Sequence, residues 1–465
     1  MERTSAWKGY SNEQLEELEA FSKGYIDFIS TNKTERECVG TAIQLAEAAG
    51  YQNLAELIAS QTPLEAGSRV YASMRGKSLM LLELGTKPLT DGLNILGAHV
   101  DSPRLDVKQN PLEEKNGLVY LDTHYYGGVK KYQWVTLPLA LHGVVAKRDG
   151  SVIPIRIGED ASDPVLVISD LLIHLAQEQM EKKASQVIEG EMLDVLCGNR
   201  PLVVEDEKDE QKDPVKAYLL SLLAERYDIE EEDFLSAELE VVPAGPAREL
   251  GLDRSMILGY GHDDRSCAYP SLRAQLGLKE VPARTALTLL VDKEEIGSVG
   301  ATGMTSLFFE NALAEVLALA GYGESTLALR RCLANSRMLS SDVSSAFDPS
   351  FAASFEPKNC AYLGRGLAFL KFTGARGKSG SNDADAEYVA LIRRIMDESS
   401  VNWQTAELGK VDVGGGGTIA YILAKYGMQV IDCGVPVMSM HSPWEVISKA
   451  DLYEALRGYR AFLAS

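Results

Sequence analysis

ALTLLVDKEEIGS, residues 286–298, joins a buried strand to a cluster of acids, and the other motifs of the chain are best understood in relation to it. Its first six residues are almost all apolar, which at this length predicts a buried strand. Asp292, Glu294 and Glu295 follow at once, before Gly297 ends the regular structure. Adjacent carboxylates repel one another and are costly to desolvate, so the pattern indicates bound cations or a catalytic need for a raised pKa. The alternative is that both glutamates are solvated turn residues.

Length, charge and cysteine content limit the classes of protein to consider. A chain of 465 residues is long enough for two or three domains. A formal net charge of -21 disfavours nucleic acids and anionic membranes as partners, because both would be repelled. The polar N-terminus and the absence of a long apolar run predict no secretory signal and no spanning helix, which favours a cytoplasmic protein. The six cysteines are scattered without a CxxC pair, so a metal site must use histidines and carboxylates.

The N-terminal region is predicted to be helical. Ser11 with Gln14 and Thr34 with Glu37 fit the capping-box pattern, and apolar residues then recur at helical spacing. Further along, the pattern changes to short strands, and the apolar run Leu93–Gly97 leads directly into a second motif.

This second motif is AHVDSP, residues 98–103. In an extended segment alternate side chains point the same way, so His99 and Asp101 lie on one face. A carboxylate beside a histidine fixes its tautomer and raises its basicity as a metal ligand. A lone motif of this kind is weak evidence, because a capping aspartate beside an exposed histidine gives the same pattern. It therefore supports a metal site only together with the other motifs.

Residues 106–249 differ in character from the segments on either side. They contain alternating strand-like stretches, charged runs and three histidines without ligand spacing, whereas the acid-rich motifs lie before and after them. We therefore predict an inserted, β-rich domain at 106–249. It interrupts a discontinuous catalytic domain formed by residues 1–105 and 250–465.

Three further motifs place oxygen and nitrogen ligands at strand ends and turns. GYGHDDRSC, residues 259–267, sets two aspartates beside a helix start, where they either cap the helix or supply a carboxylate that bridges two cations. SSDV follows a small-residue approach, and HSPWE follows the apolar run VIDCGVPVMSM. The resulting set suits two divalent ions such as zinc, manganese or cobalt. Its members are His99, Asp263, Glu295, Asp342 and His441.

The order HVDSP, GHDDRSC, DKEEIGS, SSDV and PVMSMHSPWE resembles that of the M18 metallo-aminopeptidases, the aspartyl aminopeptidase family, over nearly the whole chain. The resemblance implies an α/β fold of the zinc-exopeptidase type, with a central mixed sheet flanked by helices. It also implies that the inserted domain forms dimers, which in this family build a tetrahedral dodecamer. A homo-oligomer is therefore expected.

The resemblance also implies a role for each ligand candidate. Asp263 would bridge two metal ions, zinc in the first instance. His99 and Asp342 would complete one site, and Glu295 and His441 the other. The free α-amine of a peptide substrate can bind one ion, which would restrict cleavage to the N-terminal residue.

Other site residues are implied in the same way. Asp101 would orient His99, and Glu294 would be the general base that takes the proton from the attacking water. The peptide bond Asp263–Asp264 would be cis. His174 matches a family histidine that reaches the active site of a neighbouring subunit; the alternative is that it packs on an amphipathic helix.

Some segments depart from the family pattern. Tyr126-Gly127-Gly128 is not followed by the usual Asp-Arg-Asp motif, and Ser344-Ser345 stands where the family has a histidine. In the irregular segment KFTGARGKSGSNDAD, the cations Lys371, Arg376 and Lys378 could hold an acidic side chain.

The glycine run Gly414–Gly417 resembles the family's loop beside the substrate, although it could also serve only to let backbone pass close to the metals. Taken together, the motifs predict a metal-dependent aminopeptidase that prefers Asp or Glu at the N-terminus of its substrate. An amidohydrolase or deacylase with the same dinuclear centre is an alternative. A non-catalytic scaffold of the same fold is another.

Overall fold

The computed structural model describes residues 4–204 and 211–465, and only the backbone of Arg376. The chain forms two compact units. The first takes the chain up to Ser102, together with Ala247–Met440 and Glu445–Ser465; the second consists of Pro103–Pro246 and His441–Trp444. The sequence assigned this last segment to the catalytic domain, whereas the structure counts it with the second unit.

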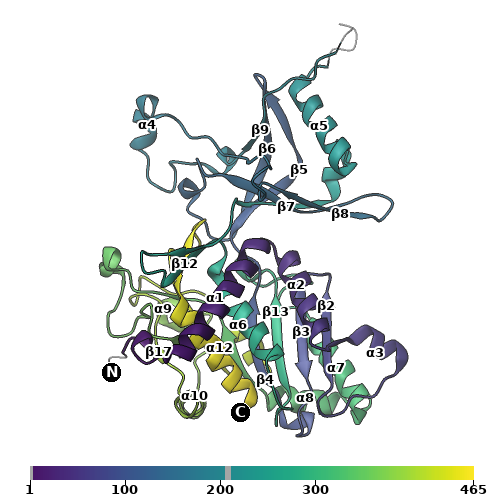
Figure 1. Ribbon diagram of the computed structural model, residues 1–465, viewed down its shortest axis with the longest axis vertical. Coiled ribbons are helices and arrows are strands. Elements are labelled where there is room, and N and C mark those ends of the chain that lie inside the picture. Colours follow the sequence, from purple (N-terminus) through teal and green to yellow (C-terminus); the bar gives the residue numbers. More distant parts are fainter. Residues whose placement is uncertain (1–3, 205–210) are drawn as a thin grey trace. The chain divides into compact units, whose positions relative to one another are not determined.

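The first unit is built on a nine-stranded sheet with the order β1-β2-β3-β13-β4-β14-β18-β16-β17 (Figure 1). Strands β13, β4, β14 and β18 run parallel to one another, while β3 is antiparallel to β13 and β16 is antiparallel to β18. The predicted mixed sheet is therefore confirmed. The strands are β1 Gln52–Asn53, β2 Arg69–Met74, β3 Ser78–Glu83, β4 Asn94–His99, β13 Ala286–Val291, β14 Arg337–Ser341, β16 Leu367–Leu370, β17 Trp403–Thr405 and β18 Gln429–Gly434.

Helices cover both faces of this sheet (Figure 1). Every residue of β3, β4 and β13 is buried, which explains why ALTLLV is a continuous apolar run: a strand covered on both faces has no polar side. Two hydrophobic clusters result. One includes residues of α1 Asn12–Thr31, α2 Glu35–Ala48, α6 His262–Leu276, α10 Ala386–Glu398 and α12 Lys449–Ala464. The other includes residues of α3 Leu54–Ser60, α7 Phe308–Leu317, α8 Thr326–Ala334 and α11 Ala420–Ala424.

Both predicted capping boxes are present. The Ser11 hydroxyl accepts the N–H of Gln14 at 3.2 Å, and the Gln14 side chain accepts the N–H of Ser11 at 3.0 Å. Thr34 and Glu37 make the same reciprocal pair, at 3.2 and 3.0 Å. These local signals start α1 and α2 at the residues that the sequence indicates.

A smaller five-stranded sheet in the first unit supports the start of α6. Its order is β11-β12-β20-β19-β15. Strand β12 leads directly into α6, and β20 begins with Glu445. The strands are β11 Arg248–Leu250, β12 Met256–Gly259, β15 Ser344–Ser345, β19 Pro436–Met438 and β20 Glu445–Ser448.

The second unit contains a six-stranded antiparallel sheet with the order β8-β7-β10-β5-β6-β9. Its elements are β5 Arg104–Lys115, β6 Leu118–Tyr126, β7 Leu139–Ala146, β8 Val152–Ile157, β9 Val195–Gly198, β10 Ala237–Pro243, α4 Gln177–Met180 and α5 Pro214–Tyr227. Across the whole described chain, no single helix is long and apolar enough to cross a membrane. One pair, Phe308–Tyr322 with Thr326–Ala334, passes by length and composition only, and it is bent by 111°.

Candidate metal centre

The candidate centre lies where adjacent parallel strands end. His99, at the end of β4, is in register with Val291, at the end of β13. On the other side of β4, β14 ends at Ser341 and Asp342 follows. The carboxyl ends of parallel strands share one edge of a sheet, and open α/β sheets bind ligands at this edge. The topology thus gathers motifs that are far apart in the sequence.

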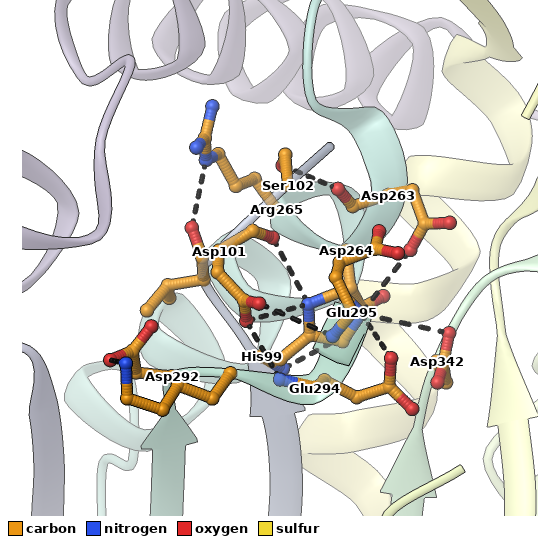
Figure 2. A network of polar contacts seen from close by, with 12 residues as sticks. His99, Asp101, Ser102, Asp263, Asp264, Arg265, Asp292, Glu294, Glu295 and Asp342 are labelled. Atoms are coloured by element: carbon orange, nitrogen blue, oxygen red, sulfur yellow. Dashed lines mark hydrogen bonds and ion pairs between the residues drawn. The ribbon is translucent and has the colours of Figure 1, made fainter. Parts of the chain in front are cut away.

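The imidazole of His99 stands at the middle of the group (Figure 2). Its Nε2 atom lies 3.2 Å from Oδ1 of Asp263, and 4.0 Å both from Oε2 of Glu294 and from Oδ1 of Asp342. The ring is 1 % exposed, whereas the side chains of Glu294 and Asp342 are 16 % and 14 % exposed. The two carboxylates are therefore slightly exposed, in contrast to the ring.

The turn at Asp263 is held from three directions. Its N–H donates to Oε2 of Glu445 at 3.1 Å, and its carbonyl accepts the hydroxyl of Ser102 at 2.7 Å. The next residue, Asp264, accepts the backbone N–H of His99 at 3.2 Å. The peptide bond between Asp263 and Asp264 is cis, which confirms the prediction.

Asp101 lies on the other side of the histidine ring. Its Oδ1 atom is 3.3 Å from Nδ1 of His99, which leaves Nε2 directed at Asp263. The carboxylate also accepts the N–H groups of Glu294 and Glu295, at 3.2 Å each. The main-chain carbonyl oxygen of Asp101 also lies 3.1 Å from Nδ1, so two oxygens of this residue orient the ring and fix its tautomer.

Two sets of three residues present ligand atoms that all lie within 4.8 Å of one another. One set is His99, Asp263 and Glu295; the other is His99, Asp264 and Asp342. Four of the five predicted ligands are therefore brought together. Asp264 was not predicted as a ligand candidate, and its only sequence signal was its place beside Asp263.

His441 is a member of neither set. It belongs to the second unit, where its Nδ1 atom lies 2.9 Å from the carbonyl oxygen of Gly128. His174 also belongs to this unit, in the short 3-10 helix Ile173–Leu175, and its side chain is exposed. The alternative that His174 packs on an amphipathic helix is therefore wrong for this chain.

The pKa values of the cluster are shifted because several carboxyl groups lie close together in a buried environment. Burial lowers the pKa of His99, but hydrogen bonds to Asp101 and Asp263 outweigh it, so the pKa stands well above its ordinary value. Burial, followed by repulsion from Glu294 and Asp264, raises the pKa of Asp342 well above its usual range. Burial and mutual repulsion therefore disfavour the ionised carboxylates, and a bound cation would offset both effects.

These residues fit a divalent metal centre. The Oδ1 atom of Asp264 is buried with no hydrogen-bond partner among the described residues, and burial raises the pKa of this carboxyl group strongly. A cation would replace the protons and satisfy these oxygens. The donor set of imidazole nitrogen and carboxylate oxygen is one that zinc accepts.

Some supporting residues carried no usable signal in the sequence. Glu445 holds the N–H of Asp263, although it is 182 positions away. Asp432 lies in β18, beside the strand β14 that Asp342 follows, and accepts the hydroxyl of Thr418 at 2.6 Å. Burial raises the pKa of Asp432 to about 7. Only the folded chain reveals these contacts.

Comparison with known proteins identifies the family. The family model described as "Aminopeptidase I zinc metalloprotease (M18)" matches residues 28–463. A relative from Clostridium acetobutylicum, named a probable M18 family aminopeptidase 1, is 58 % identical over 463 residues, which are 99 % of this chain and 98 % of the relative.

Solved structures agree. The crystal structure of an M18 family aminopeptidase from Thermotoga maritima has a TM-score of 0.93 and 44 % identity, with 100 % of this chain and 99 % of that chain covered. The S. cerevisiae mApe1 dodecamer, 20 % identical with a TM-score of 0.76 and 95 % of each chain covered, shares the fold. The chain thus belongs to the M18 family of zinc metallo-aminopeptidases, hydrolases that act on the N-terminal residues of peptides.

Proposed function

We propose that this aminopeptidase uses two divalent ions, zinc in the first instance, and prefers peptides that begin with Asp or Glu. One observation supports the dinuclear centre above all. The two sets of ligand atoms share only His99, whose Nε2 can bind one ion, so the carboxylates of the other set, Asp263 with Glu295 or Asp264 with Asp342, are left for a second ion.

The proposed ligands follow from this cluster. Asp263 would hold both ions, a role that the family resemblance implies and that its place 3.2 Å from Nε2 of His99 supports. His99 and Asp342 complete one site. Glu295 and His441 complete the other, with His441 assigned on the family resemblance. Asp264 fixes the backbone of His99 through the 3.2 Å hydrogen bond to its Oδ2 atom, which leaves its buried Oδ1 atom as a further candidate ligand beside Asp342.

Glu294 is the proposed general base. Bound divalent ions supply a water molecule of lowered pKa and polarise the scissile carbonyl group. The partly exposed carboxylate of Glu294 can take the proton of that water during attack and pass it to the departing amine. The carboxylate of Asp101 accepts the N–H groups of Glu294 and Glu295. These hydrogen bonds fix the backbone of both residues, so that the side chains of the base and of the adjacent proposed ligand point in different directions.

The preference for acidic residues rests on two lysines. Lys371 and Lys378 both face Asp383, at 3.9 and 3.0 Å, and all three side chains are about half exposed. The side-chain carboxylate of an N-terminal Asp or Glu in the substrate can replace that of Asp383 as the partner of one lysine. No additional charge is buried by this exchange. Arg376, named with them from the sequence, has its side chain outside the described residues.

The exposed segment around His174 supports self-assembly. Leu172, Ile173, Leu175 and Met180 are 55, 69, 67 and 67 % exposed, which is unusual for adjacent large apolar residues. We propose that this segment packs against a second copy of the chain. Dimers formed in this way would build a larger homo-oligomer, as in the mApe1 dodecamer, and His174 would then act in a neighbouring active site.

The test is the initial rate of the zinc-loaded protein on matched dipeptides, free or N-acetylated, that begin with Asp, Glu, Leu or Ala. We expect cleavage of the free Asp and Glu peptides only. Cleavage of the neutral peptides would retain the mechanism and refute the acidic preference. Activity confined to acetylated peptides would favour the deacylase alternative, and inactivity on all of them would favour a scaffold.

A further inference from the structure

The loop Gly414–Gly417 contains two kinds of glycine. Gly414 and Gly415 are required by the packing of the loop itself. A Cβ atom on Gly414 would lie 1.8 Å from the carbonyl oxygen of Leu408, and one on Gly415 would lie 2.5 Å from Cα of Ala375. Gly415 also has a φ of 137°, which other residues rarely adopt.

Gly416 and Gly417 have no such requirement. Neither has a positive φ. A Cβ atom on Gly416 would meet only Cδ2 of Leu408, at 3.7 Å, and one on Gly417 would have no described neighbour within 4 Å. Glycine loses more conformational entropy on folding than other residues, so its use here needs a reason outside the described chain. Bare backbone beside open space suits the close approach of another main chain.

The loop is fastened to the sheet beside the metal centre. The hydroxyl of Thr418 donates to Oδ1 of Asp432 at 2.6 Å and accepts the N–H of Ala420 at 3.3 Å. A hydroxyl group has one proton and two lone pairs, so Thr418 can donate to Asp432 while it accepts the N–H of Ala420. Asp432 is 2 % exposed, and the carbonyl of the next residue, Cys433, accepts the N–H of Asp342 at 2.8 Å. The anchor of the loop and the partner of a proposed metal ligand are thus consecutive residues of β18.

We propose that Asp432 is a positioning residue for the aminopeptidase reaction. Through Thr418 it holds the bare backbone of Gly416 and Gly417 as the surface against which the main chain of the peptide substrate lies. A second tie supports the same segment, because the N–H of Gly416 donates to the carbonyl of Thr373 at 3.2 Å. The inference rests on the aminopeptidase activity of the family and is independent of the number of ions.

Gly417→Ala separates substrate docking from folding. The added methyl group meets no described atom, so the melting temperature should stay constant or rise slightly. KM for a tetrapeptide should rise about tenfold, because the methyl group occupies the docking surface. Gly40→Ala, in α2 and also beside open space, is the matched control and should leave KM unchanged. A wild-type KM for Gly417→Ala would overturn the proposal.

The anchor is tested at both of its ends. Thr418→Val removes the hydroxyl at nearly constant volume and should lower kcat/KM about tenfold with zinc content unchanged, whereas Thr418→Ser should restore the rate. Asp432→Asn keeps an acceptor oxygen and should retain most activity, unlike Asp432→Ala. If all four variants lose activity in proportion to their melting temperatures, Asp432 is structural only and the positioning role is wrong. These variants can be compared on any free or acetylated peptide that the wild type cleaves. The positioning role of Asp432 can therefore be refuted without refuting the proposed preference for Asp or Glu.

Discussion

The carboxylate of Asp101 accepts the backbone N–H of Glu294 at 3.2 Å, so the residue that faces the histidine ring also fixes the turn of the proposed base. It also lies 3.3 Å from Nδ1 of His99 and accepts the N–H of Glu295 at 3.2 Å. The two strand-end motifs at β4 and β13 therefore share one buried anion. A single substitution at this position should affect both metal affinity and turnover.

Asp101→Asn should weaken zinc binding by about 10- to 100-fold, because it removes the charge beside His99. Turnover should fall as well, since the N–H groups of Glu294 and Glu295 donate to different oxygens and the NH₂ group that replaces one of them cannot accept a hydrogen bond. Zinc affinity is measured by competition with a chelator of known affinity. Asp348→Asn, at the partly exposed N-cap of the 3-10 helix Pro349–Ser354, serves as the control. Equal zinc affinity in the two variants would contradict the orienting role.

Glu294→Gln should lower kcat by about 1,000-fold, because the amide cannot take a proton from the attacking water. Its metal content should equal that of the wild type, since Glu294 is not a proposed ligand. Glu315→Gln, at an exposed position of α7, is the control for loss of a surface charge. An active Glu294→Gln enzyme, or one that has lost an ion, would show that the base or a ligand has been misassigned.

His441→Ala should reduce the bound zinc from two ions to one per chain if His441 completes the second site. Metal content is determined by elemental analysis of the protein after dialysis. His124→Ala, an exposed histidine of the second unit, should keep both ions. Two retained ions in His441→Ala would assign the second site to carboxylates alone.

The local parts of this fold could be predicted from the sequence because their causes are local. The capping boxes at Ser11 and Thr34 use residues three positions apart, and the apolar run Ala286–Val291 predicts the buried strand. The same is true of the HxD motif, whose two side chains share one face of an extended segment.

The remaining parts of the site depend on strand order, which no local pattern encodes. β4 lies between β13 and β14, and only this order brings Asp342 to within 4.0 Å of His99. The contact of Glu445 with Asp263 and the anchor between Thr418 and Asp432 have the same origin. Asp264 presents a different problem. The sequence shows two adjacent aspartates, but it does not indicate which of them turns towards the histidine.

Asp451 should give the stability of this protein a pH dependence of its own. It lies in α12, is fully buried, and accepts the N–H groups of Gly364 and Gly366 at 2.7 Å each. Burial raises the pKa of its carboxyl group to about 8, although both N–H groups act to lower it. The folded protein therefore keeps a proton that the unfolded chain releases above about pH 4, so the free energy of unfolding falls between about pH 4 and 8 by up to about 1.4 kcal/mol per pH unit. Asp451→Asn cannot ionise and should flatten this fall in urea unfolding measured at several pH values; parallel curves for the two proteins would mean that Asp451 is already ionised in the folded state.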